Sequence, residues 1–197
     1  MNGKFIVITG LDGSGTTSIA KALAEQDPVG LYMQTPNGAY SQTREMFDGA
    51  FRIAHPEAHY LFYLSAVVAA SDEIKERLKT HNVYCVRYLI DTVVSHRVAG
   101  VDIQLNYDLG FTTIAVPDIT IFIGLSEELR QQRISSRGKS ELDKVLDTYN
   151  TRTAFLREFN QVCPDMLYVD NNTTVDACAN TVITKLHDLA ILVTPQK

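Results

Sequence analysis

A short apolar run that leads straight into a glycine-rich segment constrains this chain more than any other feature. The run Phe5–Ile8 lies between Lys4 and Gly10, and a continuous apolar run of this length is typical of a strand buried on both faces. A helical pattern follows from about 15 to 26. The order strand, glycine-rich turn, helix is the context in which phosphate-binding loops occur, although a plain tight connection is the alternative.

The glycine-rich segment matches the pattern Gly-x-x-x-x-Gly-Lys-Ser/Thr at every position except the lysine, where Thr16 stands. Glycines allow the backbone to turn so that successive N–H groups and the helix N-terminus face an anion. Thr17 occupies the hydroxyl position that ligates a phosphate-bound Mg²⁺. We therefore expect phosphate contacts from Gly10, Asp12, Gly13, Ser14, Gly15, Thr16, Thr17 and Ser18.

Four further short strands and four longer helical patterns follow along the chain. The strands are expected at Leu31–Met33, Val83–Val86, Ile119–Ile123 and Met166–Val169, and the helices at 56–79, 126–137, 141–162 and 173–190. Short strands separated by helices need crossover connections, so the sequence predicts an α/β fold with a parallel sheet covered on both faces. Ligands of such sheets bind at the carboxyl ends of the strands.

Composition limits the partners and the setting. A formal net charge of −5 without a Lys/Arg-rich run argues against nucleic acid or a membrane surface as partner, whereas small anionic ligands need only a local positive potential. The three cysteines, Cys85, Cys163 and Cys178, form no CxxC pair and fit reduced thiols. The chain begins without a secretory-signal pattern. We expect a cytoplasmic protein with one domain over residues 1–197.

Four passages give the chain its resemblance to a known family. They are FIVITGLDGSGTTSIAKAL with Asp12 inside the loop, the helix with Leu61-Phe62-Tyr63-Leu64-Ser65-Ala66, the tripeptide Val86-Arg87-Tyr88, and PDITIFIGLSEELRQQRISSRGKSELD. Together they resemble the thymidylate kinase family of P-loop nucleoside-monophosphate kinases. The resemblance implies a P-loop NTPase three-layer fold with five parallel strands, a small lid at about 133–147, ATP and Mg²⁺ as cofactors, a nucleoside monophosphate as the small-molecule acceptor, and a homodimer.

The resemblance also implies roles for particular side chains. Asp12 would contact the acceptor sugar or nearby phosphates, Phe62 would stack on the acceptor base, and Arg87 would hold the acceptor phosphate. His96 takes a position that contacts the base, and Arg133 and Arg137 would reach the transferring phosphoryl group from the lid. The resemblance thus predicts Arg87, Arg133 and Arg137 as catalytic residues and Asp12, Phe62, Arg87 and His96 as acceptor contacts.

Some of these residues can be interpreted from spacing alone. Arg130, Arg133 and Arg137 are spaced i, i+3, i+7, which places three guanidiniums along one helical face, either for phosphate oxygens or as a solvated basic face beside Glu127 and Glu128. Arg87 follows a buried strand, where it binds phosphate or serves a helix end with Asp91.

Other candidates carry less of the argument. His55 and His59 are interpreted as structural, Arg44 and Arg152 as candidates for substrate contact, and Asp170, Asn171 and Asn172 as the donor adenine region of the family. Lys139 and Lys144 could replace the missing loop lysine.

The chain departs from the family at positions that carry chemistry. Thr16 replaces the loop lysine and Val86 replaces the aspartate before Arg87; Ala66, Ser95 and His96 alter the pocket for the base. The sequence predicts a kinase that phosphorylates a (deoxy)nucleoside monophosphate with ATP, by default dTMP to dTDP, in nucleotide biosynthesis. Two alternatives stay open: a nucleotide-binding homologue that acts as partner or sensor, and a kinase for an unusual modified nucleotide.

Overall fold

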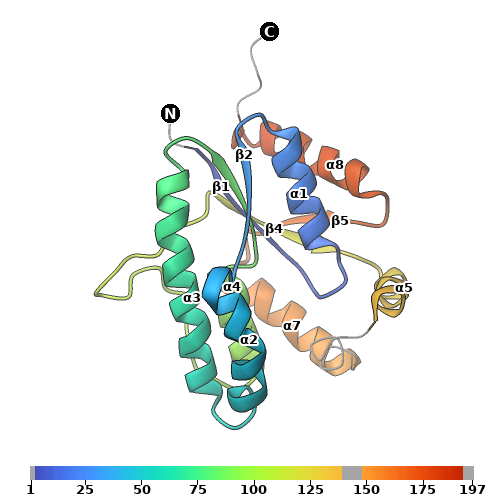
Figure 1. Ribbon diagram of the computed structural model, residues 1–197. Helices are drawn as coiled ribbons and strands as arrows, with labels where there is room; N and C mark the ends of the chain where they lie inside the picture. Colours follow the sequence, from blue (N-terminus) through green and yellow to red (C-terminus); the bar gives the residue numbers. More distant parts are fainter. Residues whose placement is uncertain (1–2, 139–147, 193–197) are drawn as a thin grey trace.

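The computed structural model describes residues 3–138 and 148–192. Their core is a five-stranded parallel sheet (Figure 1). The strands lie in the order β2-β3-β1-β4-β5, with β1 in the centre. Their bounds are β1 Phe5–Thr9, β2 Gly30–Gln34, β3 Asn82–Val86, β4 Ile119–Gly124 and β5 Leu167–Asp170. All five predicted strands are present, each within one residue or so of its predicted bounds, because continuous apolar runs are what a sheet covered on both faces requires.

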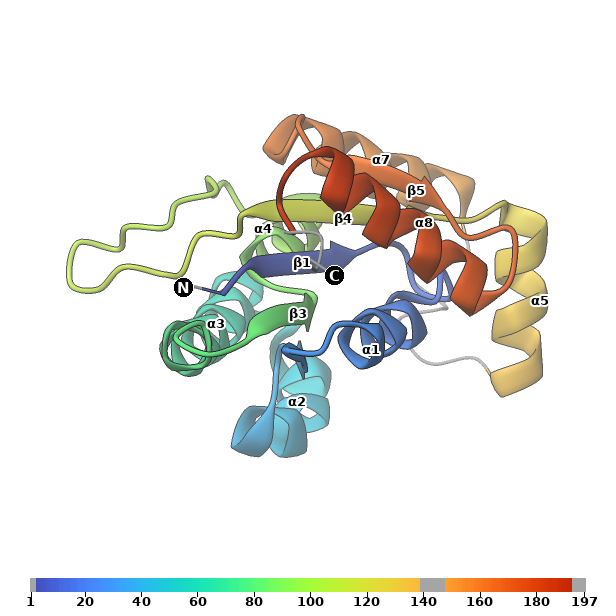
Figure 2. The ribbon, with the colours of Figure 1, turned by 90° about the horizontal axis from the view of Figure 1, so that it is seen from above.

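Alternate side chains of the sheet enter two separate cores. Phe5 and Val7 pack with helices α3, Pro56–Arg77, and α4, Leu89–Val98. Ile6 and Ile8 point to the other face and pack with α1, Thr16–Gln26, and α8, Val175–Asp188. Figure 2 shows α1 and α8 on one side of the strands and α3 and α4 on the other. The three layers confirm the predicted α/β fold.

The expected helices are present, and two further ones were not predicted. Besides α1, α3 and α8, the structure contains the expected α5, Glu127–Arg137, and α7, Tyr149–Val162. Helix α2, Gly38–Phe51, has no fully buried residue and contains two glycines, which disfavour a helix. Helix α4 is apolar on several sides and lacks the one-sided apolar pattern that predicts a helix. Residues 139–147, which hold most of the predicted lid with Lys139 and Lys144, lie outside the described residues.

Two simpler expectations can be compared with the structure. The three cysteines are free; Cys85 and Cys178 are buried and Cys163 is half-buried. Among the residues described, no helix is long and apolar enough to cross a membrane.

A buried polar contact ties α1 to the sheet. Asp27, which ends α1, accepts a hydrogen bond from the Tyr84 hydroxyl at 2.9 Å and another from Asn82 Nδ2 at 2.8 Å. Tyr84 is fully buried in β3. Because an unpaired buried hydroxyl is costly, the Asp27 carboxylate fixes how the helix after the glycine-rich loop lies on the sheet.

We expect Asp27→Ala to lower the free energy of unfolding by about 1–3 kcal/mol, since it leaves the Tyr84 hydroxyl without its acceptor. Urea denaturation followed by circular dichroism measures the change. Glu25→Ala, on the exposed face of the same helix, should alter stability by less than about 0.5 kcal/mol. Equal changes in the free energy of unfolding for the two variants would contradict a stabilising role of the hydrogen bond between Tyr84 and Asp27.

Candidate active site

The loop between β1 and α1 has the backbone that its glycines predict. Gly13 and Gly15 have φ angles of +88° and +93°, in the left-handed region that favours glycine. A Cβ on Gly10 would lie 2.6 Å from the Ile123 carbonyl oxygen and 2.6 Å from Ser14 Oγ, so a larger residue cannot occupy this position without moving the loop. The glycines therefore hold the loop against the end of β4.

The inner side of the loop offers unsatisfied hydrogen-bond donors. Gly15 is the N-cap of α1 and supplies no side-chain cap, so the first N–H groups of that helix keep their capacity to bind an anion. Ser14 Oγ is buried without a hydrogen-bond partner among the described residues. Thr17 and Ser18 are exposed on the first turn, whereas the Thr16 side chain is buried. An anion that accepts from these groups would satisfy them.

Arginines of α5 hold the outer side of the loop. Arg130 is buried, forms an ion pair with Glu127 at 2.8 Å, and donates from Nη1 to the Asp12 carbonyl at 3.2 Å. Arg133 donates to the carbonyl oxygens of Ser14 and Asn171 at 3.4 and 3.1 Å. The predicted arginine face therefore lies against the loop rather than in solvent. Arg137 is the last residue of α5, and its side chain is not described.

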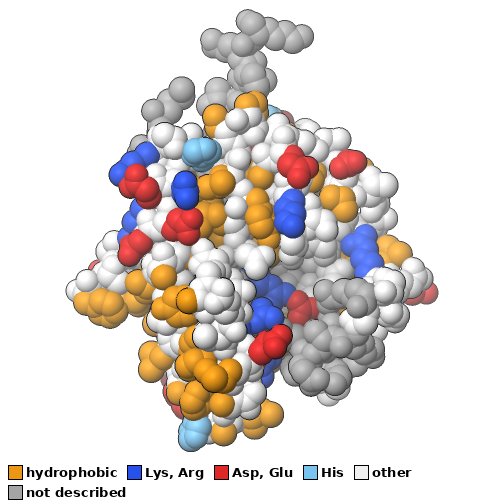
Figure 3. All heavy atoms as spheres, in the orientation of Figure 1, with side chains coloured by type: hydrophobic (Ala, Val, Ile, Leu, Met, Phe, Trp, Pro, Cys, Tyr) orange, Lys and Arg blue, Asp and Glu red, His pale blue; other side chains and the backbone are white. Residues whose placement is uncertain are grey.

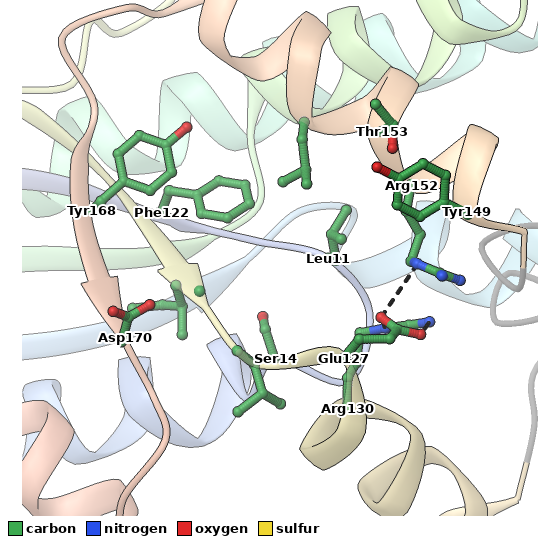
Figure 4. Close-up of a pocket in the computed structure, with 14 residues that line it drawn as sticks. Leu11, Ser14, Phe122, Glu127, Arg130, Tyr149, Arg152, Thr153, Tyr168 and Asp170 are labelled. Atoms are coloured by element: carbon green, nitrogen blue, oxygen red, sulfur yellow. Dashed lines mark hydrogen bonds and ion pairs between the residues drawn. The ribbon is translucent and has the colours of Figure 1, made fainter.

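A cavity of about 420 Å³ opens between the loop, α5, α7 and the end of β5 (Figure 4). Ser14, Arg130 and Arg152 line it, and Asp170 lies at its β5 edge. Arg152 of α7, predicted as a candidate for substrate contact, forms an ion pair with Glu127 of α5 at 3.3 Å. The cavity lies beside the donors of the loop.

A larger cavity of about 740 Å³ lies on the other side of the loop, bounded by α2, α3, α4 and α7. Asp12 and Arg87 line it at the loop end. Arg44 lines it from α2, Arg52 from the residue after α2, and His59 and Tyr63 from α3. Figure 3 shows basic and acidic side chains gathered in the hollow at the centre of the face in view. Leu11 lines both cavities, so two ligands would meet at the loop.

Arg87 is fixed at the loop end of the larger cavity. It follows β3 with a φ of +60°, and its guanidinium forms an ion pair with Asp12. Burial opposes its charge, but the carboxylates of Asp12 and Asp91 outweigh burial and raise the pKa of Arg87. Asp91 accepts from Thr9 Oγ1 at 2.5 Å and from the Tyr88 N–H at 2.9 Å, which caps α4. The structure thus brings Asp12 and Arg87 together, and Asp91 close to them.

A second polar cluster surrounds Asp48 of α2. Its Oδ1 accepts from the Tyr63 hydroxyl at 2.8 Å and lies 2.8 Å from His59 Nε2, while its Oδ2 lies 2.9 Å from Arg52 and 3.8 Å from Arg44. Burial raises the pKa of Asp48, but the hydrogen bonds and the charge of Arg52 prevail and lower it to about 2. Asp48 is therefore a carboxylate that anchors four side chains of the cavity wall.

His96 joins this cluster from α4 without a ring nitrogen to spare for a ligand. Its Nε2 lies 2.8 Å from His59 Nδ1, and its Nδ1 lies 2.7 Å from the Thr92 carbonyl. Burial is the main cause that lowers the pKa of His96 to about 4. His96 lines the cavity at the position expected to contact the base. His59, interpreted from sequence as structural, lines the same cavity.

The structure places Phe62, the residue of α3 expected to stack on the acceptor base, against α2. Its ring is stacked on Phe47 of α2, with centroids 4.1 Å apart, and it does not line the cavity. The neighbouring Tyr63 lines the cavity instead. The cause is α2, which the sequence did not predict and which covers the ring of Phe62.

The sequence also missed residues whose position depends on α2 and α4. Asp48 is in α2, Arg52 directly follows α2, and Asp91 is in the first turn of α4. Asp91 accepts a hydrogen bond from the Tyr88 N–H at the start of α4, but Tyr88 is not an N-cap residue that marks a helix start in a sequence. No signal marks Asp48 either, since its role depends on the contact of three helices.

Comparisons with known proteins agree with this geometry. The family model described as thymidylate kinase matches residues 8–182. A probable thymidylate kinase of Methanococcus aeolicus is 29% identical over 96% of this chain and 98% of its own, and one of Methanocaldococcus jannaschii is 31% identical over 74% and 79%. A solved thymidylate kinase of Candida albicans, whose published description reports broad substrate specificity, has a TM-score of 0.75 with 16% identity over 96% of this chain and 93% of that one.

We expect His96→Asn to make stability less dependent on pH. In the folded protein the pKa of His96 is lowered to about 4, whereas an unfolded chain titrates near 6.5. As the pH falls below about 6.5, the unfolded chain binds a proton that the folded one does not, so stability is lost. Between about pH 7 and 5 the wild type should lose about 2 kcal/mol more than His96→Asn.

Urea denaturation at the two pH values measures this difference. His81→Asn is the control, because His81 lies outside the cluster, before β3. The pH dependence of this control should match that of the wild type. A wild type and a His96→Asn variant with the same pH dependence would contradict the burial of a neutral His96.

Proposed function

Since this chain belongs to the thymidylate kinase family, we propose that it transfers the γ-phosphoryl group of ATP to dTMP and releases dTDP and ADP. One observation carries the proposal: a glycine loop with unsatisfied donors lies between two cavities, one beside α5 and α7 and one that contains Arg87. A loop in that place can hold a triphosphate in line with the phosphate of a second ligand.

The donor side of this proposal depends on main-chain groups. The first-turn N–H groups of α1 and the Ser14 hydroxyl would donate hydrogen bonds to the phosphate oxygens of ATP. Arg133, which holds Ser14 and Asn171, would add positive charge beside the loop. The Ser14 hydroxyl and the uncapped N–H groups fit a triphosphate because no side chain among the described residues competes for them.

Magnesium would be held jointly by the nucleotide and the protein. The described residues contain no group of three His, Cys, Asp or Glu side chains that could hold a metal alone. Mg²⁺ commonly keeps several waters and binds through substrate phosphates with few protein ligands. The exposed Thr17 hydroxyl on the first turn of α1 fits that arrangement, and the ion would neutralise charge on the phosphates.

On the acceptor side, Arg87 would fix the phosphate of dTMP, and Asp12 would hold Arg87 in place. The bidentate fork of a guanidinium suits phosphate oxygens. The attacking phosphate oxygen is already anionic, so positioning and charge neutralisation suffice and no general base is needed. We also assign Arg133 and Arg137 to the transferring group, with residues of about 133–147 as the lid of one domain over 1–197.

The substitutions at positions 16 and 86 weaken this chemistry without removing its scaffold. Arg130 and Arg133 of α5 bring two guanidiniums to the loop from outside it, at the Asp12 and Ser14 carbonyls. Asp91 supplies a carboxylate in the larger cavity. Arg87, which directly follows Val86, lines the same cavity. These residues support turnover without the usual lysine and aspartate. A homodimer and a cytoplasmic location complete the proposal.

The test is a coupled assay of ADP release with ATP, Mg²⁺ and each common nucleoside monophosphate. We expect turnover with dTMP above all others. Calorimetry with a non-hydrolysable ATP analogue accompanies it. Binding of the analogue without turnover of any acceptor would favour a sensor and overturn the proposal. Failure to bind the analogue would contradict the assignment of the loop between β1 and α1 as a phosphate-binding loop.

We expect Thr16→Lys to raise kcat/KM for dTMP by about tenfold or more, because it restores a point charge near the transferring phosphoryl group. The assay above measures the gain, and Lys21→Ala, on the exposed face of α1, serves as a control without effect. If Thr16→Lys abolishes activity, the loop binds phosphate in a different geometry and the assigned roles are wrong.

A further inference from the structure

We propose that Asp91 is a positioning residue for the transfer reaction, because it fixes Arg87 relative to the loop between β1 and α1. This inference rests on the proposed function, since it concerns the alignment of the same two ligands. Asp91 is in the first turn of α4 and lines the larger cavity. Its carboxylate contacts the residue before the loop and the residue after Arg87.

The sheet aligns the two strands only up to the point where the loop and Arg87 begin. The parallel register of β1 and β3 ends at the pair Ile8 and Val86, and the Arg87 N–H donates to the Ile8 carbonyl at 3.0 Å. Beyond this pair, β1 continues into the glycine loop and β3 into α4. Val86 packs with Ile8 in the core and has no hydrogen-bonding side chain. A polar link at this edge therefore has to come from another element.

Asp91 supplies that link with both of its carboxylate oxygens. Oδ1 accepts from Thr9 Oγ1 at 2.5 Å, and Oδ2 accepts from the Tyr88 N–H at 2.9 Å. Thr9 is fully buried and directly precedes Gly10, the first glycine of the loop. Tyr88 directly follows Arg87. One side chain of α4 thus connects the start of the loop to the segment that carries the acceptor arginine.

Arg87 depends on this contact because its backbone conformation is unfavourable. Its φ of +60° lies in the left-handed region, which residues other than glycine keep only where their surroundings enforce it. The peptide N–H before its Cα is held by Ile8, and the one after it by Asp91. At the far end of the side chain, the guanidinium forms the ion pair with Asp12 of the loop. Both ends of Arg87 are therefore fixed relative to the loop.

The rate of phosphoryl transfer depends on this alignment more than the binding of either ligand does. The reacting oxygens must lie in line, and a displacement of about 1 Å can slow a reaction by about a hundredfold. Each ligand would still find its own contacts, the triphosphate at the loop and the acceptor phosphate at Arg87. Loss of the link through Asp91 therefore lowers kcat and leaves both KM values nearly unchanged. A residue that only caps α4 would not produce this division between kcat and KM.

Thr9→Val tests the link and leaves the cap of α4 in place, because Asp91 can still accept from the Tyr88 N–H. We expect kcat, expressed per folded molecule, to fall by about tenfold or more, with KM for ATP and for dTMP within about threefold of the wild type. Thr9→Ser keeps the hydroxyl and should restore kcat. Thr120→Val is the matched control with wild-type kcat, because Thr120 is a buried threonine of β4 that lines neither cavity.

A double-variant comparison shows whether Asp91 acts through Thr9. Asp91→Ala should lower kcat at least as much as Thr9→Val does. The variant with both substitutions should be no slower than Asp91→Ala alone, because Thr9 then has no contact left to lose. Losses in kcat that multiply in the double variant would overturn the proposal. An unchanged kcat in Thr9→Val, with or without a raised KM, would overturn it as well.

A second measurement tests the link without activity. The Arg87 and Tyr88 amides both donate hydrogen bonds beside the link, so their hydrogen exchange reports how firmly this segment is held. We expect both amides to exchange about fivefold faster or more in Thr9→Val, and at the wild-type rate in Thr120→Val. Equal rates in Thr9→Val and the wild type would overturn the proposal. If the wild type does not turn over dTMP, the proposed function fails instead, and hydrogen exchange still decides whether Asp91 holds Arg87 to the loop.

Discussion

The glycine loop depends on side chains that bind its carbonyl oxygens from outside. Asn171, fully buried at the end of β5, donates to the Ser14 carbonyl at 2.8 Å, and Arg133 donates to the same oxygen at 3.4 Å. Arg130 donates to the Asp12 carbonyl. Because these carbonyl oxygens are occupied on the outer side, the N–H groups and the Ser14 hydroxyl can face the inner side, where an anion would bind. The loop is thus shaped by β5 and α5 as much as by its own glycines, and both cavities take their position from it.

This support explains how the chain can lack a lysine in the loop and still form a site for phosphate. In the usual pattern one side chain inside the loop carries the positive charge. Here the guanidiniums come from α5, and Glu127 connects Arg130 to Arg152 of α7 (Figure 4). Because these guanidiniums are held by ion pairs between helices, they are fixed in position and cannot extend freely toward the transferring phosphoryl group. Positions outside the loop can therefore compensate for electrostatics, while the precise approach to the transferring group is what Thr16 gives up.

The parts that the sequence predicted are those that depend on local pattern. Phe5–Ile8 was predicted as a strand buried on both faces, and the glycines predicted a tight turn after it, so the loop and its helix followed. The larger cavity could not be derived in the same way. Helix α2 has no fully buried residue, and its Asp48 gains importance only from His59 and Arg52, which no spacing places beside it. The position of Arg87 was predictable because it directly follows a strand, whereas its contact with Asp12 depends on the shape of the loop.

The exchange of Phe62 for Tyr63 follows from the geometry of a helix. Successive residues point about 100° apart, so only one of two neighbours can face a given cavity. Phe47 and Tyr40 of α2 contact the ring of Phe62, which turns that side of α3 into a contact between helices and leaves Tyr63 toward the cavity. The packing of α2 on α3 therefore decides which aromatic side chain of α3 lines the larger cavity, and Asp48 of the same helix α2 fixes the hydroxyl of Tyr63 there.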